Sequence, residues 1–238
     1  SNFMDPGSIP EAADFVGPTD GVIFVRQAQI RYTKGGFSVA LENPETTLVG
    51  STSSDRGALP DLTRRYGWKG DWGTFGVGAL ARQLKVDRPG YDDSSFAGGL
   101  TVGGKWLMGS NDTLHYQLTG GEGIARYIGL GITGDGVLDA SDGSLDTTGV
   151  LAGYVGWRHA FSPKLRSNVI FARSDYDNDA ALTGPLATKS VQSLRANVFY
   201  SPLPKVDVGA ELMFGKREVE SGAEGDITRV QFTTKYSF

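Results

Sequence analysis

The C-terminal end of the chain alternates between apolar and polar side chains. The apolar positions are Val230, Phe232, Tyr236 and Phe238, and the polar positions are Arg229, Gln231, Thr233, Lys235 and Ser237. This period of two predicts a β-strand with one apolar face. About ten residues at roughly 3.3 Å each, tilted by about 45°, cover the roughly 25 Å apolar band of an outer membrane. We therefore predict a strand that closes a transmembrane β-barrel, with Phe238 at the membrane interface. An amphipathic strand of a soluble β-sandwich is the alternative.

The same alternation recurs along the chain and predicts ten earlier strands. Their approximate bounds are 22–33, 37–42, 61–68, 72–84, 96–108, 113–119, 148–161, 164–174, 190–200 and 205–217. Short turns alternate with long polar loops, as in outer-membrane barrels. All ten prolines fall in the predicted turns and loops, as expected because proline has no backbone N–H to donate to a sheet. The sequence therefore predicts an all-β protein, an up-and-down antiparallel transmembrane barrel with about eleven strands.

Aromatic residues gather toward the strand ends that meet the short turns. This group includes all four tryptophans and comprises Trp68, Trp72, Trp106, Trp157, Tyr32, Phe37, Tyr66, Phe161, Tyr200, Tyr236 and Phe238. A girdle of aromatic side chains at one membrane interface explains this distribution, whereas a soluble sandwich gives no reason for it.

Charged residues indicate which face of each strand turns inward, because an arginine facing lipid near the middle of the membrane costs about 2–4 kcal/mol. The predicted inward set comprises Gln27, Gln29, Arg31, Arg65, Lys105, His115, Arg158, Arg166, Asn168, Arg195, Asn197, Asp207, Glu211, Arg229, Gln231 and Lys235. The predicted lipid-facing set comprises Leu194, Ala196, Val198, Val206, Val208, Ala210, Leu212 and Phe214. The strand at 72–84 stays undetermined, because Trp72 and Phe75 have opposite parity.

The overall composition argues against some classes of structure and function. Mean hydropathy is −0.22, so no transmembrane helix of about twenty apolar residues is expected, whereas a barrel needs apolar residues only at alternate positions. The net charge of −4 argues against a nucleic-acid partner. Cysteine is absent, which suits an oxidising periplasm or cell exterior. We expect neither a cofactor nor a metal.

The first 20 residues combine three prolines with four acidic residues, Asp5, Glu11, Asp14 and Asp20, and have no regular apolar period. They are predicted to form a long loop. An odd number of strands cannot close an antiparallel ring, and an open edge in lipid leaves backbone groups unpaired. We therefore expect either one further strand or a larger barrel, of which this chain is the C-terminal portion.

Four segments resemble the DcaP-like outer-membrane porins of Gram-negative bacteria. They are SNFMDPGSIPEAADFVGP at the start, FVRQAQIRYT at 24–33, GEGIARYI at 121–128 and RVQFTTKYSF at the end. The resemblance implies homotrimers of barrels with about 16 strands, in which the third extracellular loop folds into the pore. It implies that residues 1–20 are this inward-folded constriction loop, that residues 21–238 are the C-terminal strands of a single barrel domain, and that about five strands are missing. It also implies small organic anions, such as dicarboxylates, as solutes.

Basic residues dominate the predicted inward set and would face the acids of residues 1–20 across the lumen. Opposed charges create a transverse field that orients dipolar solutes, and successive arginines favour anions. We therefore predict a porin for passive diffusion of small carboxylate-bearing solutes, with Arg31, Arg65, Arg166, Arg195 and Arg229 as successive partners. The full set of channel-lining candidates is Gln27, Gln29, Arg31, Arg65, Lys105, Arg158, Arg166, Arg195, Arg229 and Lys235. The alternative for each arginine is an ion pair with a lumenal acid that stiffens the wall.

Two other classes of function stay open: a barrel enzyme similar to an outer-membrane phospholipase, and a structural or adhesive barrel with a plugged lumen. His115 and His159 are the only histidines, and no serine-centred nucleophile elbow accompanies them, which favours a protein that is not an enzyme. Planar-bilayer conductance would distinguish a channel from both alternatives.

Two further patterns carry little weight. Residues 129–134 match GxGxxG, but no strand leads into them and no helix follows, so a glycine-rich loop is favoured over a nucleotide site. The acids Asp135, Asp139, Asp142 and Asp146 miss the spacing of an EF-hand. They are predicted to lie in a solvated outer loop that divalent ions bridge to lipopolysaccharide. Membrane lipid and lipopolysaccharide are thus expected partners, and the Gram-negative outer membrane is the expected location.

Overall fold

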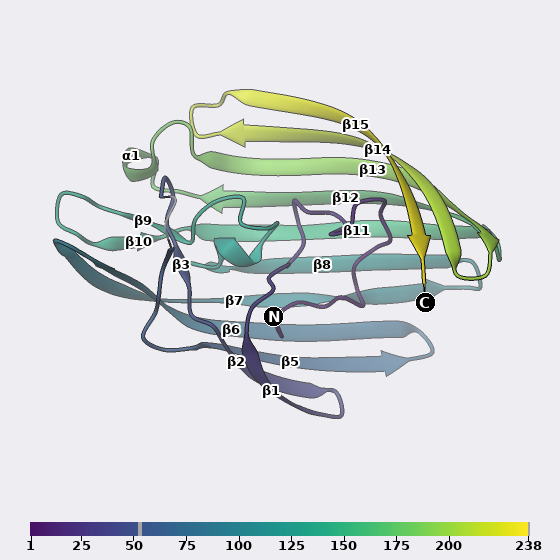
Figure 1. The fold of residues 1–238 in the computed structure, drawn as a ribbon, viewed down its shortest axis with the longest axis horizontal. Helices are drawn as coiled ribbons and strands as arrows, with labels where there is room; N and C mark the ends of the chain where they lie inside the picture. The colour runs from purple at the N-terminus through teal and green to yellow at the C-terminus, as the bar shows by residue number, and fades with distance from the viewer. Residues whose placement is uncertain (52–53, 238) are drawn as a thin grey trace.

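The computed structural model of the protein describes residues 1–51 and 54–237. Within these residues, eleven strands form one curved sheet in which each strand pairs with the next along the chain (Figure 1). The strands are β1 (Gln29–Lys34), β2 (Phe37–Glu42), β5 (Asp61–Gly70), β6 (Gly73–Arg88), β7 (Tyr91–Met108), β8 (Asp112–Glu122), β11 (Gly149–Ser162), β12 (Leu165–Asp177), β13 (Thr188–Leu203), β14 (Val206–Val219) and β15 (Glu224–Tyr236). All ten pairings are antiparallel. The predicted all-β, up-and-down architecture is confirmed; Phe238 lies outside the described residues.

The connections divide the sheet into two ends. At the short-turn end, two or three residues join the strands at 35–36, 71–72, 109–111, 163–164 and 204–205. At the long-loop end, the segments 43–60, 123–148 and 178–187 carry the small elements. These elements are β3 (Thr46–Thr47), β4 (Ser54–Asp55), η1 (Ala125–Tyr127), β9 (Gly136–Leu138), β10 (Leu145–Thr147) and α1 (Ala180–Thr183). No helix among the described residues is long and apolar enough to cross a membrane.

Three predicted boundaries are wrong. The first strand begins at Gln29 rather than at 22, because Val22 and Ile23 leave the sheet and are buried in apolar clusters. The predicted loop between residues 84 and 96 is a continuation of β6 and β7, which stay paired up to Arg88 and Tyr91. The tight turn that joins them contains Gly90 at φ 88°, a backbone conformation that glycine adopts without strain.

The predicted turn at 201–204 is also shorter than expected. β13 continues to Leu203, so Pro202 lies within a strand, contrary to the prediction that all prolines avoid strands. The pairing register with β14 shifts between Tyr200 and Leu203. Such a bulge leaves one residue outside the ladder, which is where a strand tolerates the missing N–H of proline.

The two faces of the sheet have opposite character. We call the face that residues 1–28 contact the inner face. It carries buried polar residues such as Asn168, Asn197 and Glu211, each at most 6% exposed. The other face, the outer face, carries exposed apolar residues such as Leu194, Val198 and Leu212 at 48, 44 and 39% exposure. This is the reverse of a water-soluble sandwich and agrees with the predicted inward and outward sets of β13 and β14.

The structure also resolves the orientation of β6. Leu80, Arg82, Leu84 and Val86 are buried on the inner face, whereas Ala81 and Asp87 are exposed. Phe75 belongs to the outer parity, and Trp72 precedes the strand in the turn, so it carries no information about the phase. The apparent conflict between these two aromatic residues therefore disappears.

The aromatic residues at the short-turn end point outward. Trp68, Trp72, Trp106 and Trp157 are 46 to 54% exposed. Trp68 stacks on Phe75, with 5.6 Å between ring centroids. This arrangement matches the predicted interfacial girdle.

A small apolar core lies on the inner face of the sheet. Residues 123–132 form a second segment that folds inward, and its residues Ile124, Tyr127 and Ile128 are fully buried. They pack with Phe3 and Ile23 of the N-terminal segment. The two segments also share a β-bridge between Ile23 and Ile128. Apolar packing therefore joins the N-terminal segment to a loop more than 90 residues away in sequence.

The alternation of the two faces predicts the effect of a charge on the outer face. We expect Leu212→Arg, in the middle of β14, to lower the free energy of unfolding by about 2–4 kcal/mol in lipid vesicles, because the guanidinium must enter hydrocarbon. Thr228→Arg, next to charged residues at the long-loop end, should cost about 0–1 kcal/mol. Urea titrations followed by tryptophan fluorescence measure both. Equal costs for the two variants would contradict the orientation.

Candidate solute channel

Residues 1–28 lie along the inner face of the sheet (Figure 1). Each of the four acids predicted in the constriction loop meets a basic residue predicted to line the channel. The four ion pairs are Asp5–Arg65, Glu11–Arg166, Asp14–Arg229 and Asp20–Arg195. The basic partners come from β5, β12, β13 and β15. The ion pairs therefore fix the N-terminal segment along the width of the sheet.

The pair between Glu11 and Arg166 has the geometry of a strong ion pair. Arg166 Nε and Nη2 donate to the two carboxylate oxygens at 2.6 and 2.7 Å. The guanidinium also lies 3.2 Å from Asp207 and packs over the ring of Phe199, 5.2 Å from its centroid. Such bidentate contacts fix orientation as well as distance. Arg166 is thereby held against the wall.

Arg195 is the most buried of these cations, with a side chain that is 2% exposed. Its guanidinium lies 3.1 Å from Asp20, 3.7 Å from Glu211 and 4.0 Å from Asp14. It also donates to the hydroxyl of Thr19 at 3.1 Å. A charge at this depth requires several compensating partners, and the N-terminal segment supplies most of them.

Asp14 connects two wall cations. Arg229 donates to its carboxylate at 2.8 Å. Although burial raises the pKa of Asp14, the hydrogen bonds from Arg229 and from the Val16 backbone outweigh it and hold the pKa below its ordinary value of 3.8. Asp14 therefore stays ionised and paired at neutral pH.

A second buried network of charged residues joins residues 123–135 to the inner face of the sheet. Arg82, whose side chain is fully buried, lies 3.0 Å from Asp135 and 3.3 Å from Asp61. Arg126 lies 3.2 Å from Asp61. Burial and the neighbouring Asp61 raise the pKa of Tyr127 well above its ordinary value of 10. Tyr127 thus stays protonated and donates to Asp61 at 2.7 Å.

This second network was not predicted. The rule that charges turn inward would have found Arg82 if Trp72 had been excluded from its strand. Asp61 has the same parity as Arg65 and was detectable by the same rule. Asp135 was expected in a solvated loop, but it is fully buried, because its carboxylate accepts from the Arg126 backbone and from Thr47.

Gln27, a predicted channel-lining residue, belongs to this second network. Its side-chain amide donates to Glu42 and to the Tyr127 hydroxyl, and its carbonyl oxygen accepts from Arg126 at 2.7 Å. Gln29 and Arg31 instead line a hollow of about 470 Å³ next to residues 1–6. The two glutamines therefore have different surroundings, although both lie on the inner side.

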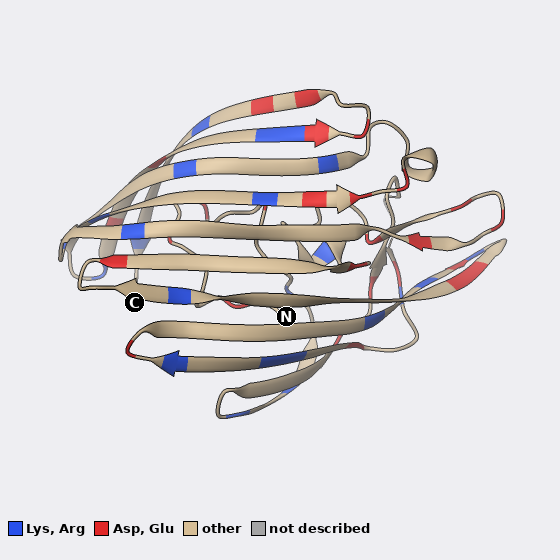
Figure 2. Ribbon diagram, turned by 180° about the vertical axis from the view of Figure 1, so that it is seen from behind, with Lys and Arg blue, Asp and Glu red and all other residues tan. Residues whose placement is uncertain are grey.

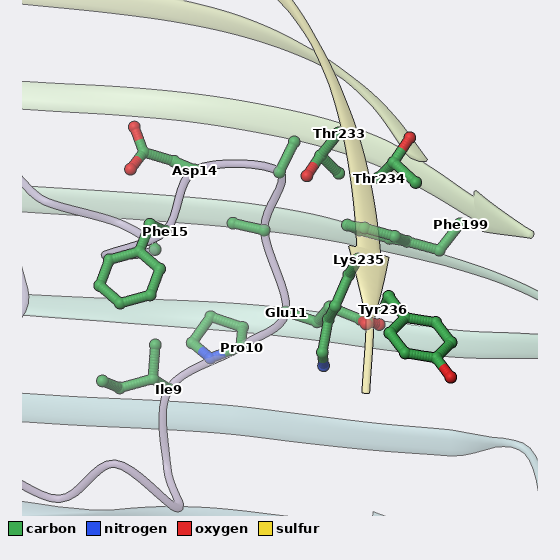
Figure 3. Close-up of a pocket in the computed structure, with 13 residues that line it drawn as sticks. Ile9, Pro10, Glu11, Asp14, Phe15, Phe199, Thr233, Thr234, Lys235 and Tyr236 are labelled. Atoms are coloured by element: carbon green, nitrogen blue, oxygen red, sulfur yellow. The ribbon is translucent and has the colours of Figure 1, made fainter. Parts of the chain in front are cut away.

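The remaining predicted cations line a separate hollow near the short-turn end. Lys105, Arg158 and Lys235 surround a volume of about 450 Å³, together with Glu11 and His115. The side chains of Lys105 and Arg158 have no hydrogen-bond or ion-pair partner among the described residues. Figure 3 shows Lys235 projecting toward the N-terminal segment beside Glu11, at the edge of an adjoining hollow of about 610 Å³. These three cations therefore border open space between the sheet and the N-terminal segment.

Among residues 1–51 and 54–237, neither histidine forms a catalytic arrangement with a serine hydroxyl. His115 Nδ1 lies 3.0 Å from the backbone carbonyl oxygen of Ser8, whose hydroxyl contacts Tyr154 instead. His159 contacts Asp112 at 2.8 Å. Among the described residues, no cluster of three or more acidic or histidine side chains has the geometry to hold a metal. Residues 129–134 lie in turns and bends between η1 and β9, as predicted for a chance GxGxxG match.

An up-and-down sheet with an apolar outer face, a charged inner face and an inward-lying segment defines the class of outer-membrane porins. The family description "DcaP outer membrane protein" matches residues 1–238, and the chain belongs to this family. It is therefore a Gram-negative outer-membrane protein. No significant sequence match is found among proteins of curated function.

Solved structures agree with this assignment. The outer membrane channel DcaP of Acinetobacter baumannii is similar at a TM-score of 0.87 and 25% identity, over 100% of this chain and 69% of that one. Two others share the fold at lower identity. An anion-selective porin from Comamonas acidovorans has a TM-score of 0.56 and 11% identity, over 87% of this chain and 57% of that one. OmpT, an outer membrane protein of Vibrio cholerae, has a TM-score of 0.54 and 13% identity, over 98% of this chain and 73% of that one.

The burial of Arg195 generates a prediction about stability. Arg195→Met leaves Asp20 and Glu211 without their main cation, and removing one partner of a buried pair costs about 3–5 kcal/mol. We expect this decrease in the free energy of unfolding, measured by urea titration in lipid vesicles. Arg56→Met, at an exposed arginine with no hydrogen-bond or ion-pair partner among the described residues, should change it by less than about 0.5 kcal/mol. If the two variants were equally stable, the ion pairs would not hold the segment.

Proposed function

We propose that the protein is a passive, non-enzymatic pore for small anionic solutes, chiefly those that carry carboxylates. The observation that carries this proposal is the hollow at the short-turn end, where Lys105, Arg158 and Lys235 gather around a single carboxylate, Glu11. Because three cations surround one acid, the electrostatic potential in that space is positive. A confined space with an excess of one charge concentrates counter-ions.

The wall cations divide into two groups in this proposal. Arg65, Arg166, Arg195 and Arg229 neutralise the acids of residues 1–20 and hold that segment as the constriction loop. Lys105, Arg158 and Lys235, with Arg31 and Gln29 at the other hollow, are the residues that a passing solute would contact. Conduction requires binding that is weak enough to release the solute. Lysines and arginines that border an open hollow meet this requirement better than a cation with a 2% exposed side chain, such as Arg195.

The pore proposal predicts a specific change in ion selectivity. In planar bilayers with a salt gradient, the wild-type protein should show a reversal potential of the sign expected for anion preference. The triple variant Lys105→Gln, Arg158→Gln, Lys235→Gln should shift it toward zero, because the positive charge around the hollow is lost.

The control removes the same charge elsewhere. Lys34, Lys164 and Lys205 are exposed in or beside the short turns, so their triple glutamine variant should keep the anion preference. A wild-type protein with clear cation preference would refute the proposal. A lumen variant with unchanged reversal potential would refute the role given to the three cations.

We further propose that the protein is a homotrimer whose interface includes the outer face of β5. Arg64 lies on that face with no carboxylate partner among the described residues, over the ring of Phe37 at 5.5 Å. It is four residues from Trp68 of the girdle, about 13 Å along the strand, which is well inside the apolar band. A cation at this depth is costly in lipid. Contact with a neighbouring copy would reduce that cost.

The variant Arg64→Leu tests whether Arg64 faces a neighbouring subunit or lipid. If Arg64 lies in a subunit interface, the variant should shift trimers toward monomers in light scattering of the detergent-solubilised protein. The barrel itself should stay folded, as judged by its shifted mobility in unheated detergent gels. An unchanged trimer that is about 2–4 kcal/mol more stable would instead mean that Arg64 faces lipid.

A further inference from the structure

A band of charged side chains crosses the outer face at the long-loop end of β12–β15. It consists of three ion pairs: Arg173–Asp175, Lys189–Glu218 and Lys216–Glu224, with N–O distances of 2.5, 2.9 and 2.7 Å. The strand register aligns Arg173 with Gln192 and Gln192 with Lys216. Figure 2 shows basic and acidic stretches at these strand ends. We call these six residues the charged band.

The charged band lies where the apolar outer face ends, toward the long loops. In the register, the next outward-facing row toward the short-turn end contains Phe171, Leu194 and Phe214, aligned across β12, β13 and β14. They are 43, 48 and 51% exposed. The face therefore changes within one row from large apolar residues to charges. This is the change expected where acyl chains end and head groups begin.

The three cations are accessible. The side chains of Arg173, Lys189 and Lys216 are 45, 51 and 38% exposed. Exposed ion pairs of this kind contribute little to stability, so their cations can be transferred to a stronger anion at small cost. A phosphate group with its three acceptor oxygens is such an anion.

The composition of the charged band argues against a protein partner. The central part of a protein interface is apolar and poor in lysine and glutamate, whereas the charged band contains two lysines and two glutamates. The long-loop end of an outer-membrane barrel is the extracellular end. The molecules beside the charged band are therefore those of the outer leaflet of the membrane.

We propose that the charged band binds the phosphate groups of a phosphorylated glycolipid, lipopolysaccharide, in the outer leaflet. Arg173, Lys189 and Lys216 contact phosphate oxygens, while the acyl chains lie against Phe171, Leu194 and Phe214. Asp175, Glu218 and Glu224 bind divalent cations that bridge to further phosphates, since carboxylate and phosphate oxygens are the ligands that Mg²⁺ and Ca²⁺ prefer. The mixture of charges thus serves a ligand that arrives with its own counter-ions.

The test uses the detergent-purified protein and native mass spectrometry with lipid A as the probe. Wild-type protein should bind bisphosphorylated lipid A in the presence of Mg²⁺. The variant Arg173→Gln, Lys189→Gln, Lys216→Gln should bind it at least about tenfold more weakly, because each cation near a lipid surface contributes favourably. The variant Lys69→Gln, Lys164→Gln, Lys205→Gln removes equal charge at the opposite end and should bind like wild type. Shifted mobility in unheated gels confirms that each variant is folded.

Two comparisons identify the ligand chemistry. In the first comparison, wild-type protein should bind dephosphorylated lipid A as weakly as the band variant (Arg173→Gln, Lys189→Gln, Lys216→Gln) binds lipid A. In the second, removal of Mg²⁺ should weaken the binding of lipid A to the wild-type protein. Equal binding of lipid A by wild type and the band variant would overturn the proposal. Equal binding of phosphatidylglycerol and lipid A would overturn the assignment to a glycolipid. A change in oligomeric state without a change in lipid A binding would assign the charged band to a subunit contact instead.

Discussion

The exclusion of charge from the lipid-facing side of the sheet is the constraint on which the rest of the structure depends. Hydrocarbon on the outer face requires apolar residues at alternate positions, and the charges of the same strands then turn inward. On the inner face several of these charges are buried, as at Arg195 and Glu211, and an unpaired buried charge is costly. The buried arginines of the inner face therefore need anions close to them. Residues 1–28 supply these anions, so the position of this segment follows from the charges of the wall.

The two inward segments stabilise the inner face by different means. The N-terminal segment contacts the wall mainly through ion pairs, as at Glu11 and Arg166. The segment at 123–132 adds an apolar cluster built around Tyr127 and Ile128. Because Phe3 and Ile23 belong to that cluster, the two segments pack as one unit. Packing in the loop at 123–132 therefore also helps to position the N-terminal segment.

Much of this arrangement could be predicted from the sequence. Alternation located every strand of the sheet, and the cost of a lipid-facing charge oriented β13 and β14 correctly. The four acids of residues 1–20 and their four basic partners were all selected, although their pairing was not, since pairing depends on how the loop crosses the strands. The network around Arg82 was missed because Trp72 was assigned to a strand. The buried position of Asp135 depends on tertiary contacts with Thr47 and Arg126, which no local pattern encodes.

The length of β6 and β7 has a consequence for the cell surface. These strands contain 16 and 18 residues, whereas about ten suffice to cross the membrane, so their paired ends project beyond it. The projection is braced: Leu84 and Val86 pack with Leu48 and Leu145, and the backbone N–H of Leu145 donates to Asp93 at 2.7 Å. Proteases cleave flexible loop tips far more readily than hydrogen-bonded strands. The paired ends of β6 and β7 therefore form a braced hairpin beyond the membrane, and we expect a protease at the cell surface to cut it more slowly than an unpaired loop.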